Sequence, residues 1–292
     1  MIVRVSWFLL GALVLVQICY PLTSGDLRDG LTVTTVVLGV AGSVWHATVS
    51  RGFRATATLV GAAMLGGFAV EAAGVATGFP FGTYDYSGEL GPKLLGVPLI
   101  IPLAWTWMAW PAWLAASRLV ADRAARIVVA AVGLTAWDLF LDPQMVAEGY
   151  WRWHAPTPAL PGLSGIPVSN YLGWLGFALL VMTAMSTIKN VDVSQNQDRP
   201  MLALWLWTYF SSVLAHAVFL HLPHSALWGG IGMGAVVLPL LIRETARLTR
   251  ARAGLAPETT GLTREAAERD RGTAGPTEET AGPTRETASR RP

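Results

Sequence analysis

The sequence predicts an all-α membrane protein, a bundle of about eight transmembrane helices with a disordered C-terminal tail. Three observations predict this class. Hydrophobic residues make up 52% of the 292 residues and charged residues only 14%, whereas soluble domains carry about 25% charge. Long apolar runs recur as far as residue 242, and a membrane helix needs about 20 such residues. Charge then collects in the segment that follows the last apolar run.

Eight apolar runs are long enough to cross a bilayer. They are residues 5–22, 31–49, 55–78, 97–117, 124–142, 167–188, 201–221 and 224–242. We expect the first run to be a membrane helix and not a signal peptide, because no small-residue cleavage site follows Tyr20-Pro21.

Two of these runs contain unusual residues. In the fourth run, three prolines predict kinks that open space in the bundle, and four tryptophans predict a mixture of packing and an interfacial belt. These residues are Pro98, Pro102 and Pro111, and Trp105, Trp107, Trp110 and Trp113. We expect the fifth run to end at Asp142-Pro143, because Asp before Pro is common in turns.

Basic residues in the connecting segments predict the orientation of the bundle. With the N-terminus in the cytoplasm, the inner segments hold twelve Lys and Arg and the outer segments three, as the positive-inside rule requires. The outer three are Arg28, Lys93 and Arg152. Eight spans with both ends in the cytoplasm, in a plasma-membrane protein, is therefore the predicted topology.

The C-terminal segment has a different composition. Residues 251–292 contain seven Arg and seven acidic residues among Gly, Pro, Thr and Ala, and they include two near-copies of the heptapeptide TAGPTEE. Such a segment has too little apolar surface to offset the entropy lost on ordering. We expect a membrane domain over 1–250 and a disordered cytoplasmic tail over 251–292. We favour a tail that is dispensable for function over one that binds a partner.

Several classes of function are disfavoured. The net charge of +2 comes with no basic stripe, so nucleic acid is not an expected partner. Cys19 is the single cysteine, and no predicted span contains two of the five histidines at the His-x-x-x-His or His-x-x-His spacing of a metal-binding helix. Nucleotide-binding loops and the serine hydrolase elbow are missing from the sequence. We therefore expect neither a metal nor a cofactor.

Polar residues of several predicted spans meet near the outer face. They are Glu71 in the third span, Asp138 and Asp142 in the fifth, His216 and His221 in the seventh, and His224 at the start of the eighth. A carboxylate in a membrane helix costs about 2.5–3.5 kcal/mol on insertion scales, so it usually has a function. We read Glu71 and Asp138 as functional and leave Asp142 open between function and turn. We read His216 and His221 as hydrogen-bonding a neighbouring span.

A series of motifs lies in the predicted outer loops and in the ends of the spans next to them. They are GFAVE at 67–71, GFPFGTYDY at 78–86, GPKLLGVP at 91–98, AWDL at 136–139, LDP at 141–143, GYWRW at 149–153 and GIPVSNYLGW at 165–174. Together they resemble the membrane-bound carotenoid hydratases of carotenoid and bacterioruberin biosynthesis. The resemblance covers about residues 65–175 and is specific, because it rests on several motifs in order.

The resemblance implies the addition of water to the terminal C1–C2 double bond of an acyclic carotenoid end, of the lycopene or the bisanhydrobacterioruberin type. The expected partners are a long carotenoid in the bilayer, water and other enzymes of the pathway. Chemically, the reaction needs a proton donor, a site for a tertiary carbocation and a directed water, but no redox cofactor. The family resemblance assigns no residue roles.

Our own assignment of roles follows from residue chemistry. Apolar surroundings favour the neutral form of a carboxyl group, so we predict Asp138 as the acid, with Glu71 and Asp142 around the water. Trp137 is predicted to stabilise the cation, an effect worth about 2 kcal/mol when desolvated. The remaining predicted substrate-binding residues are Tyr84, Tyr86, Trp151, Trp153, Asn170 and Trp174.

Two other classes remain open. A non-catalytic membrane protein that binds carotenoids or assists the pathway needs the same lipid-facing groove, but it gains nothing from buried acids. A proton-coupled transporter also uses intramembrane acids and histidines. Against a transporter, the two halves show no inverted repeat, and the polar residues cluster near one face instead of the midplane.

Overall fold

The computed structural model describes residues 2–188 and 196–252. By their internal contacts, Met1–Glu244 form one compact unit and Thr245–Pro292 a second, and the bundle described below belongs to the first unit. The predicted disordered tail lies outside the described residues from residue 253 onward.

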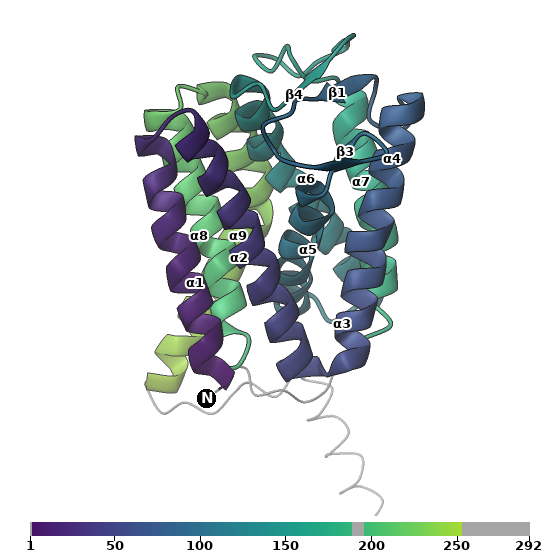
Figure 1. Ribbon diagram of the computed structural model, residues 1–292. Helices are drawn as coiled ribbons and strands as arrows, with labels where there is room; N and C mark the ends of the chain where they lie inside the picture. The colour runs from purple at the N-terminus through teal and green to yellow at the C-terminus, as the bar shows by residue number, and fades with distance from the viewer. Residues whose placement is uncertain (1, 189–195, 253–292) are drawn as a thin grey trace, which may run out of the picture. The chain divides into compact units, whose positions relative to one another are not determined.

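The chain forms a bundle of antiparallel helices, which confirms the predicted all-α membrane fold (Figure 1). Three predicted spans contain an irregular segment: 3₁₀ segment η1 ends the first, and π-helical segments η2 and η3 interrupt or end the third and seventh. The elements are α1 (Ile2–Cys19), η1 (Tyr20–Leu22), α2 (Asp26–Arg51), α3 (Phe53–Leu59), η2 (Val60–Leu65), α4 (Gly66–Thr77), α5 (Ile100–Leu119), α6 (Arg123–Ala147), α7 (Val168–Met185), α8 (Arg199–Leu214), η3 (Ala215–Phe219) and α9 (Pro223–Arg252).

Seven of the eight predicted spans form helices that are long and apolar enough to cross a membrane. The exception among the described residues is the fourth span, which forms α5, a helix of 20 residues. Its four tryptophans and two prolines explain its lower hydropathy, because neither residue type is strongly apolar.

Helix α5 lies at the centre of the bundle. It contacts α2, α3, α4, α6, α7 and α8, and in Figure 1 it lies behind α2. All four of its tryptophans are buried against these helices. The predicted interfacial belt is therefore wrong for this helix, because its neighbours cover every side of it.

Helix α6 does not end at Asp142-Pro143 as predicted; it continues through Pro143 to Ala147. A proline inside a helix lacks an N–H and leaves the carbonyl four residues earlier without its helical donor. Here the hydroxyl of Ser225, on α9, donates to that carbonyl of Leu139 at 2.7 Å. Membrane helices tolerate proline when a neighbouring helix supplies such a bond.

The same arrangement occurs in α5. Pro111 removes the helical donor for the Trp107 carbonyl, and the hydroxyl of Ser43 on α2 donates to this oxygen at 2.8 Å. Pro111 and Pro143 are thus accommodated by hydroxyls from adjacent helices. Of the other prolines predicted to kink the fourth span, Pro98 precedes the helix and Pro102 lies in its first turn, where no helical donor is lost.

Two short strand pairs cover one end of the bundle. Strand β1 (Tyr84–Tyr86) pairs antiparallel with β4 (Trp151–Trp153), with Asp85 opposite Arg152. Strand β2 (Lys93–Leu94) pairs with β3 (Val97–Pro98). Because side chains alternate along a strand, β1 and β4 turn their aromatic residues inward and expose the charged pair between them.

We call the end of the bundle that carries residues 78–99 and 148–167 the loop end, and the end where α1 begins the N-terminal end (Figure 1). Helices α4 and α6 end at the loop end, and α5 and α7 begin there. The positions of Glu71, Asp138 and Asp142 near the ends of α4 and α6 therefore bring these residues to the same level.

Candidate functional site

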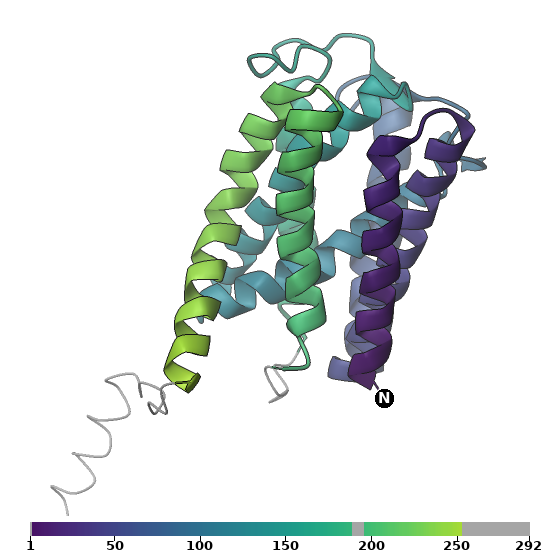
Figure 2. The same ribbon diagram turned by 90° about the vertical axis from the view of Figure 1, so that its left-hand side faces the viewer.

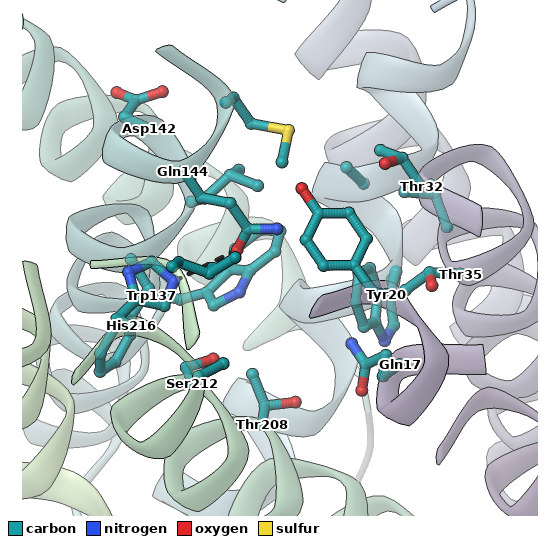
Figure 3. A pocket seen from close by; sticks show the side chains of 18 of the residues that line it. Gln17, Tyr20, Thr32, Thr35, Trp137, Asp142, Gln144, Thr208, Ser212 and His216 are labelled. Carbon is teal, nitrogen blue, oxygen red and sulfur yellow. Dashed lines mark hydrogen bonds between the residues drawn. The ribbon is translucent and has the colours of Figure 1, made fainter. Parts of the chain in front are cut away.

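A cavity of about 470 Å³ lies inside the loop-end half of the bundle, within the range of about 300–1,000 Å³ that is usual for small-molecule sites. Its walls are mainly apolar and aromatic. Polar side chains enter it from several helices. In Figure 3, for example, the Tyr20 side chain points across the cavity toward Gln144. The acidic lining residues are Glu71 and Asp142.

Glu71 is buried and accepts three hydrogen bonds. The hydroxyls of Tyr84 and Tyr86 donate to its Oε2 at 2.6 and 2.8 Å, and Trp105 Nε1 donates to its Oε1 at 3.1 Å. Burial, and next the adjacent Glu71 carboxylate, raise the pKa of Tyr84 and Tyr86, so both phenols keep their protons and act as donors. Three donors on one carboxyl group favour its ionised form.

Asp138 and Asp142 form a second acidic group on α6. The side-chain nitrogen of Asn170 donates to Asp138 Oδ2 at 2.9 Å and also to Asp142 Oδ2, so it bridges the two carboxyl groups. Trp151 Nε1 donates to Asp142 Oδ1 at 3.1 Å. Asp138 Oδ1 is buried and has no hydrogen-bond partner within residues 2–188 and 196–252.

Aromatic rings enclose the acids. The indoles of Trp105 and Trp174 stack with centroids 3.7 Å apart, and Trp137 meets Trp174 edge-on at 6.1 Å. Across the β1–β4 pair, Tyr84 contacts Trp153 and Tyr86 contacts Trp151, each with centroids 5.6 Å apart. The acids therefore face a space bounded by π faces, which attract a positive charge.

A second polar group lies on the side of the cavity formed by η3. His216 Nδ1 lies 2.8 Å from Ser225 Oγ, and His216 Nε2 lies 3.2 Å from Gln144 Oε1. The hydroxyl of Ser225 also donates to the Leu139 carbonyl. Through these contacts His216 joins η3 to α6 and α9 beside the cavity.

Nine of the ten sequence-predicted site residues line this cavity: Glu71, Tyr84, Tyr86, Trp137, Asp142, Trp151, Trp153, Asn170 and Trp174. The tenth, Asp138, is fully buried and reaches the cavity only through Asn170 and Asp142. The structure thus brings the predicted residues together, and their individual roles remain predictions.

Sequence reasoning missed three contributors to the site. Trp105 was grouped with the other tryptophans of its helix, although it donates to Glu71; nothing in the sequence distinguishes it from Trp107. For Gln144 and Tyr20, no motif or pattern in the sequence indicates a place in the site. His216 hydrogen-bonds two neighbouring helices, as expected, and it also lines the cavity.

In the described part of the chain, no group of three or more His, Cys, Asp or Glu residues is arranged to hold a metal ion. The polar side chains that line the cavity include carboxyl groups, phenols, amides, hydroxyls and one imidazole.

Comparison with known proteins connects the chain to carotenoid biosynthesis. The bisanhydrobacterioruberin hydratase of Haloarcula japonica is 38% identical to it over 113 residues, which are 37% of this chain and 37% of that protein. The match thus spans little more than a third of that relative's length. No solved structure matches the chain significantly.

The broader match is to a family model described as carotenoid biosynthesis protein. It covers residues 31–241, a range that contains every element lining the cavity except α1 and η1. Since the model covers well over half of the chain, this protein belongs to the carotenoid biosynthesis protein family.

Proposed function

We propose that the protein is a hydratase that adds water to the terminal C1–C2 double bond of an acyclic carotenoid end. The observation that carries the proposal is a set of three buried carboxyl groups in or behind an aromatic cavity. Their hydrogen-bond partners among residues 2–188 and 196–252 are all neutral. Acids that are costly to bury in a membrane and have neutral partners point to proton chemistry.

The first step is protonation of the less substituted alkene carbon, C2. Asp142 lines the cavity, whereas Asp138 lies behind it, so Asp142 delivers the proton that the pair shares. Two adjacent carboxyl groups in a site of low polarity do not both ionise. A proton between them also accounts for Asp138 Oδ1, which has no other partner in the described residues. Asp138 thus supplies the proton indirectly, and Asp142 is the contact to substrate.

The second step is capture of the tertiary cation at C1 by water. Glu71 lines the same cavity as Asp142, and the three hydrogen bonds that it accepts favour its ionised form. It stabilises the cation and accepts a proton from the water as the C1–O bond forms. The faces of Trp137 and Trp174 add cation–π stabilisation. Exchange through water in the cavity returns the proton from Glu71 to the aspartate pair, so the cycle needs no other reactant.

The membrane orientation completes the proposal. The ends of α2 and α5 and the starts of α6 and α8 carry Arg51, Arg118, Arg123 and Arg199, and all lie at the N-terminal end. By the positive-inside rule that end is cytoplasmic, in the plasma membrane. The acids then lie near the outer face.

The test is mass spectrometry of pigments from a host that accumulates acyclic carotenoids, grown in water enriched in heavy oxygen. Wild-type protein should increase the pigment mass by one or two waters that carry the label. Asp142→Asn should abolish the gain, and Asp85→Asn, on the outward face of β1, should not. No mass change with wild-type protein in the membrane contradicts the proposal. Carotenoid that copurifies with the protein would then indicate a binding protein.

A further inference from the structure

The residues that line the cavity differ sharply in exposure. Those that are exposed all belong to α1, η1, α8 and η3: Ile18 (47%), Leu22 (69%), Phe210 (49%), Leu214 (56%) and Phe219 (44%). Among the described residues, no cavity-lining residue of α4, α5, α6 or α7 is exposed. The cavity is thus closed by the inner helices and reaches the surface on the side of α1 and α8.

The position of this opening along the bundle follows from one contact. Trp207 Nε1 donates to Gln17 Oε1 at 2.7 Å and joins α8 to α1, and both residues line the cavity. All five exposed lining residues come later than this pair along α1 and α8, which both run toward the loop end. The Gln17–Trp207 bond therefore closes the side nearer the N-terminal end, and the opening lies between it and the loop end.

Both helices lose regular geometry at the opening. After Cys19, α1 gives way to the 3₁₀ segment η1, which contains Pro21, and α8 gives way to the π-helical segment η3. Such changes alter the direction in which side chains point, and π-helical turns occur often at functional sites. In Figure 2, α1 and α8 lie side by side toward the viewer, and other helices are visible between them.

The chemistry of the opening selects an apolar occupant. Its five exposed residues are apolar, and they lie within or at the end of helices able to span a membrane. A cavity of about 470 Å³ accommodates an end group and not an entire long chain. The remainder of a long substrate must stay outside, next to the surface on which the cavity opens.

We infer that the slot between α1 and α8 is a lateral portal, through which the end of a long acyclic isoprenoid chain enters the cavity from the lipid. The rest of the chain remains in the bilayer against Leu22, Leu214 and Phe219. This inference rests on the proposed function, since it gives the route by which the substrate reaches Asp142 and Glu71. The occupant is the substrate chain itself, because the slot leads directly to the acids.

The first experiment narrows the slot with Ile18→Trp and Leu214→Trp. The matched controls are Leu15→Trp and Val218→Trp, which add the same ring at exposed positions that do not line the cavity. With a long acyclic carotenoid, the portal variants should lose activity about tenfold, equivalent to about 1.4 kcal/mol, and the controls should not. A short isoprenoid with the same terminal double bond should be hydrated nearly as well by all four variants. Equal losses in portal variants and controls would overturn the portal.

A second experiment measures occupancy without catalysis. In a Cys19→Ser background, Leu214→Cys and the control Val218→Cys are labelled with a membrane-permeant maleimide in vesicles with and without lycopene. We expect lycopene to slow labelling of Leu214→Cys about tenfold and to leave Val218→Cys unchanged. Equal labelling with and without lycopene at Leu214→Cys would contradict the portal, even if hydration is normal. Protection at Leu214→Cys without any hydration would instead contradict the hydratase and support the portal.

Discussion

The two ends of the bundle bury acids in opposite ways. At the loop end, Glu71, Asp138 and Asp142 have neutral hydrogen-bond partners within the described residues. At the N-terminal end, Asp198 is equally buried but receives two charge-assisted bonds from Arg51, both at 2.9 Å, and one from Arg118 at 3.1 Å. Neutralisation by arginine makes Asp198 a link between helices, whereas the loop-end acids have only neutral donors among the described residues.

Histidines at the two ends repeat this contrast. His46 accepts from Trp110 Nε1 at 2.9 Å and lies 2.9 Å from the Gln197 carbonyl and 3.8 Å from Asp198. It thus belongs to the arginine-paired cluster. His216 instead faces the cavity. Burial of a polar residue in this membrane protein therefore indicates function only when the partner is considered too.

The largest effect on activity is expected for Asp142, one of the acids with neutral partners. Asp142→Asn keeps the shape of the side chain and removes the proton, so hydration should fall at least about 100-fold, the usual range for loss of an acid–base group. The thermal unfolding midpoint in detergent should remain at the wild-type value or rise. Pigment mass spectrometry and a thermal melt check both. Near wild-type activity in a folded Asp142→Asn protein would remove this residue from the mechanism.

The converse change should affect stability instead. Asp198→Asn removes the charge that Arg51 and Arg118 contact, and breaking a buried ion pair costs about 3–5 kcal/mol. Because Arg51 retains some exposure, we expect the lower figure of about 3 kcal/mol, seen as a lower unfolding midpoint. Activity per folded molecule should stay unchanged. A specific loss of activity would show that the two ends are coupled.

Two tryptophans of α5 offer a matched pair for the same comparison. Trp105 donates to Glu71 and Trp110 donates to His46, and both are buried. A hydrogen bond to a charged group is worth about 1.5–3 kcal/mol, so Trp105→Phe should lower activity about tenfold. Trp110→Phe should lower the unfolding midpoint and leave activity per folded molecule unchanged. Similar activity losses in both variants would indicate a general packing effect.

The smallest effect is expected at Tyr86. Tyr86→Phe removes one of the two phenols that donate to Glu71 Oε2, and Tyr84 remains in place at 2.6 Å. Because Oε2 keeps the Tyr84 donor, the loss should reduce activity only about threefold, less than the effect of about 1.5–3 kcal/mol for an uncompensated bond to a charged group. The double variant Tyr84→Phe/Tyr86→Phe should lose much more. Steady-state hydration rates in vesicles measure the difference, and an additive double variant would argue against their sharing Glu71.

The sequence predicted those features that follow from hydropathy and from the position of a residue along its helix. The apolar runs predicted the helices, and the positions of Glu71 and Asp142 along them predicted that these acids share a level. It was uninformative where a partner comes from a distant segment. That α6 continues through Pro143 depends on Ser225, and the donors of Glu71 depend on the fold of residues 78–99 and on helix α5. Pairing of β1 with β4 joins two connecting segments for which hydropathy predicts no structure.

The low hydropathy of α5 has a consequence for how the chain is made. Insertion by the translocon depends on the apolar character of each segment as it emerges, and α5 falls short of the apolarity of the other seven helices. Its tryptophans and prolines are accommodated by α2, α6 and other helices that surround it. We therefore expect α5 to enter the bilayer together with α6 as a hairpin, against an α2 that is already in place. A ribosome-bound chain that ends after α5 is expected to leave this segment outside the membrane core.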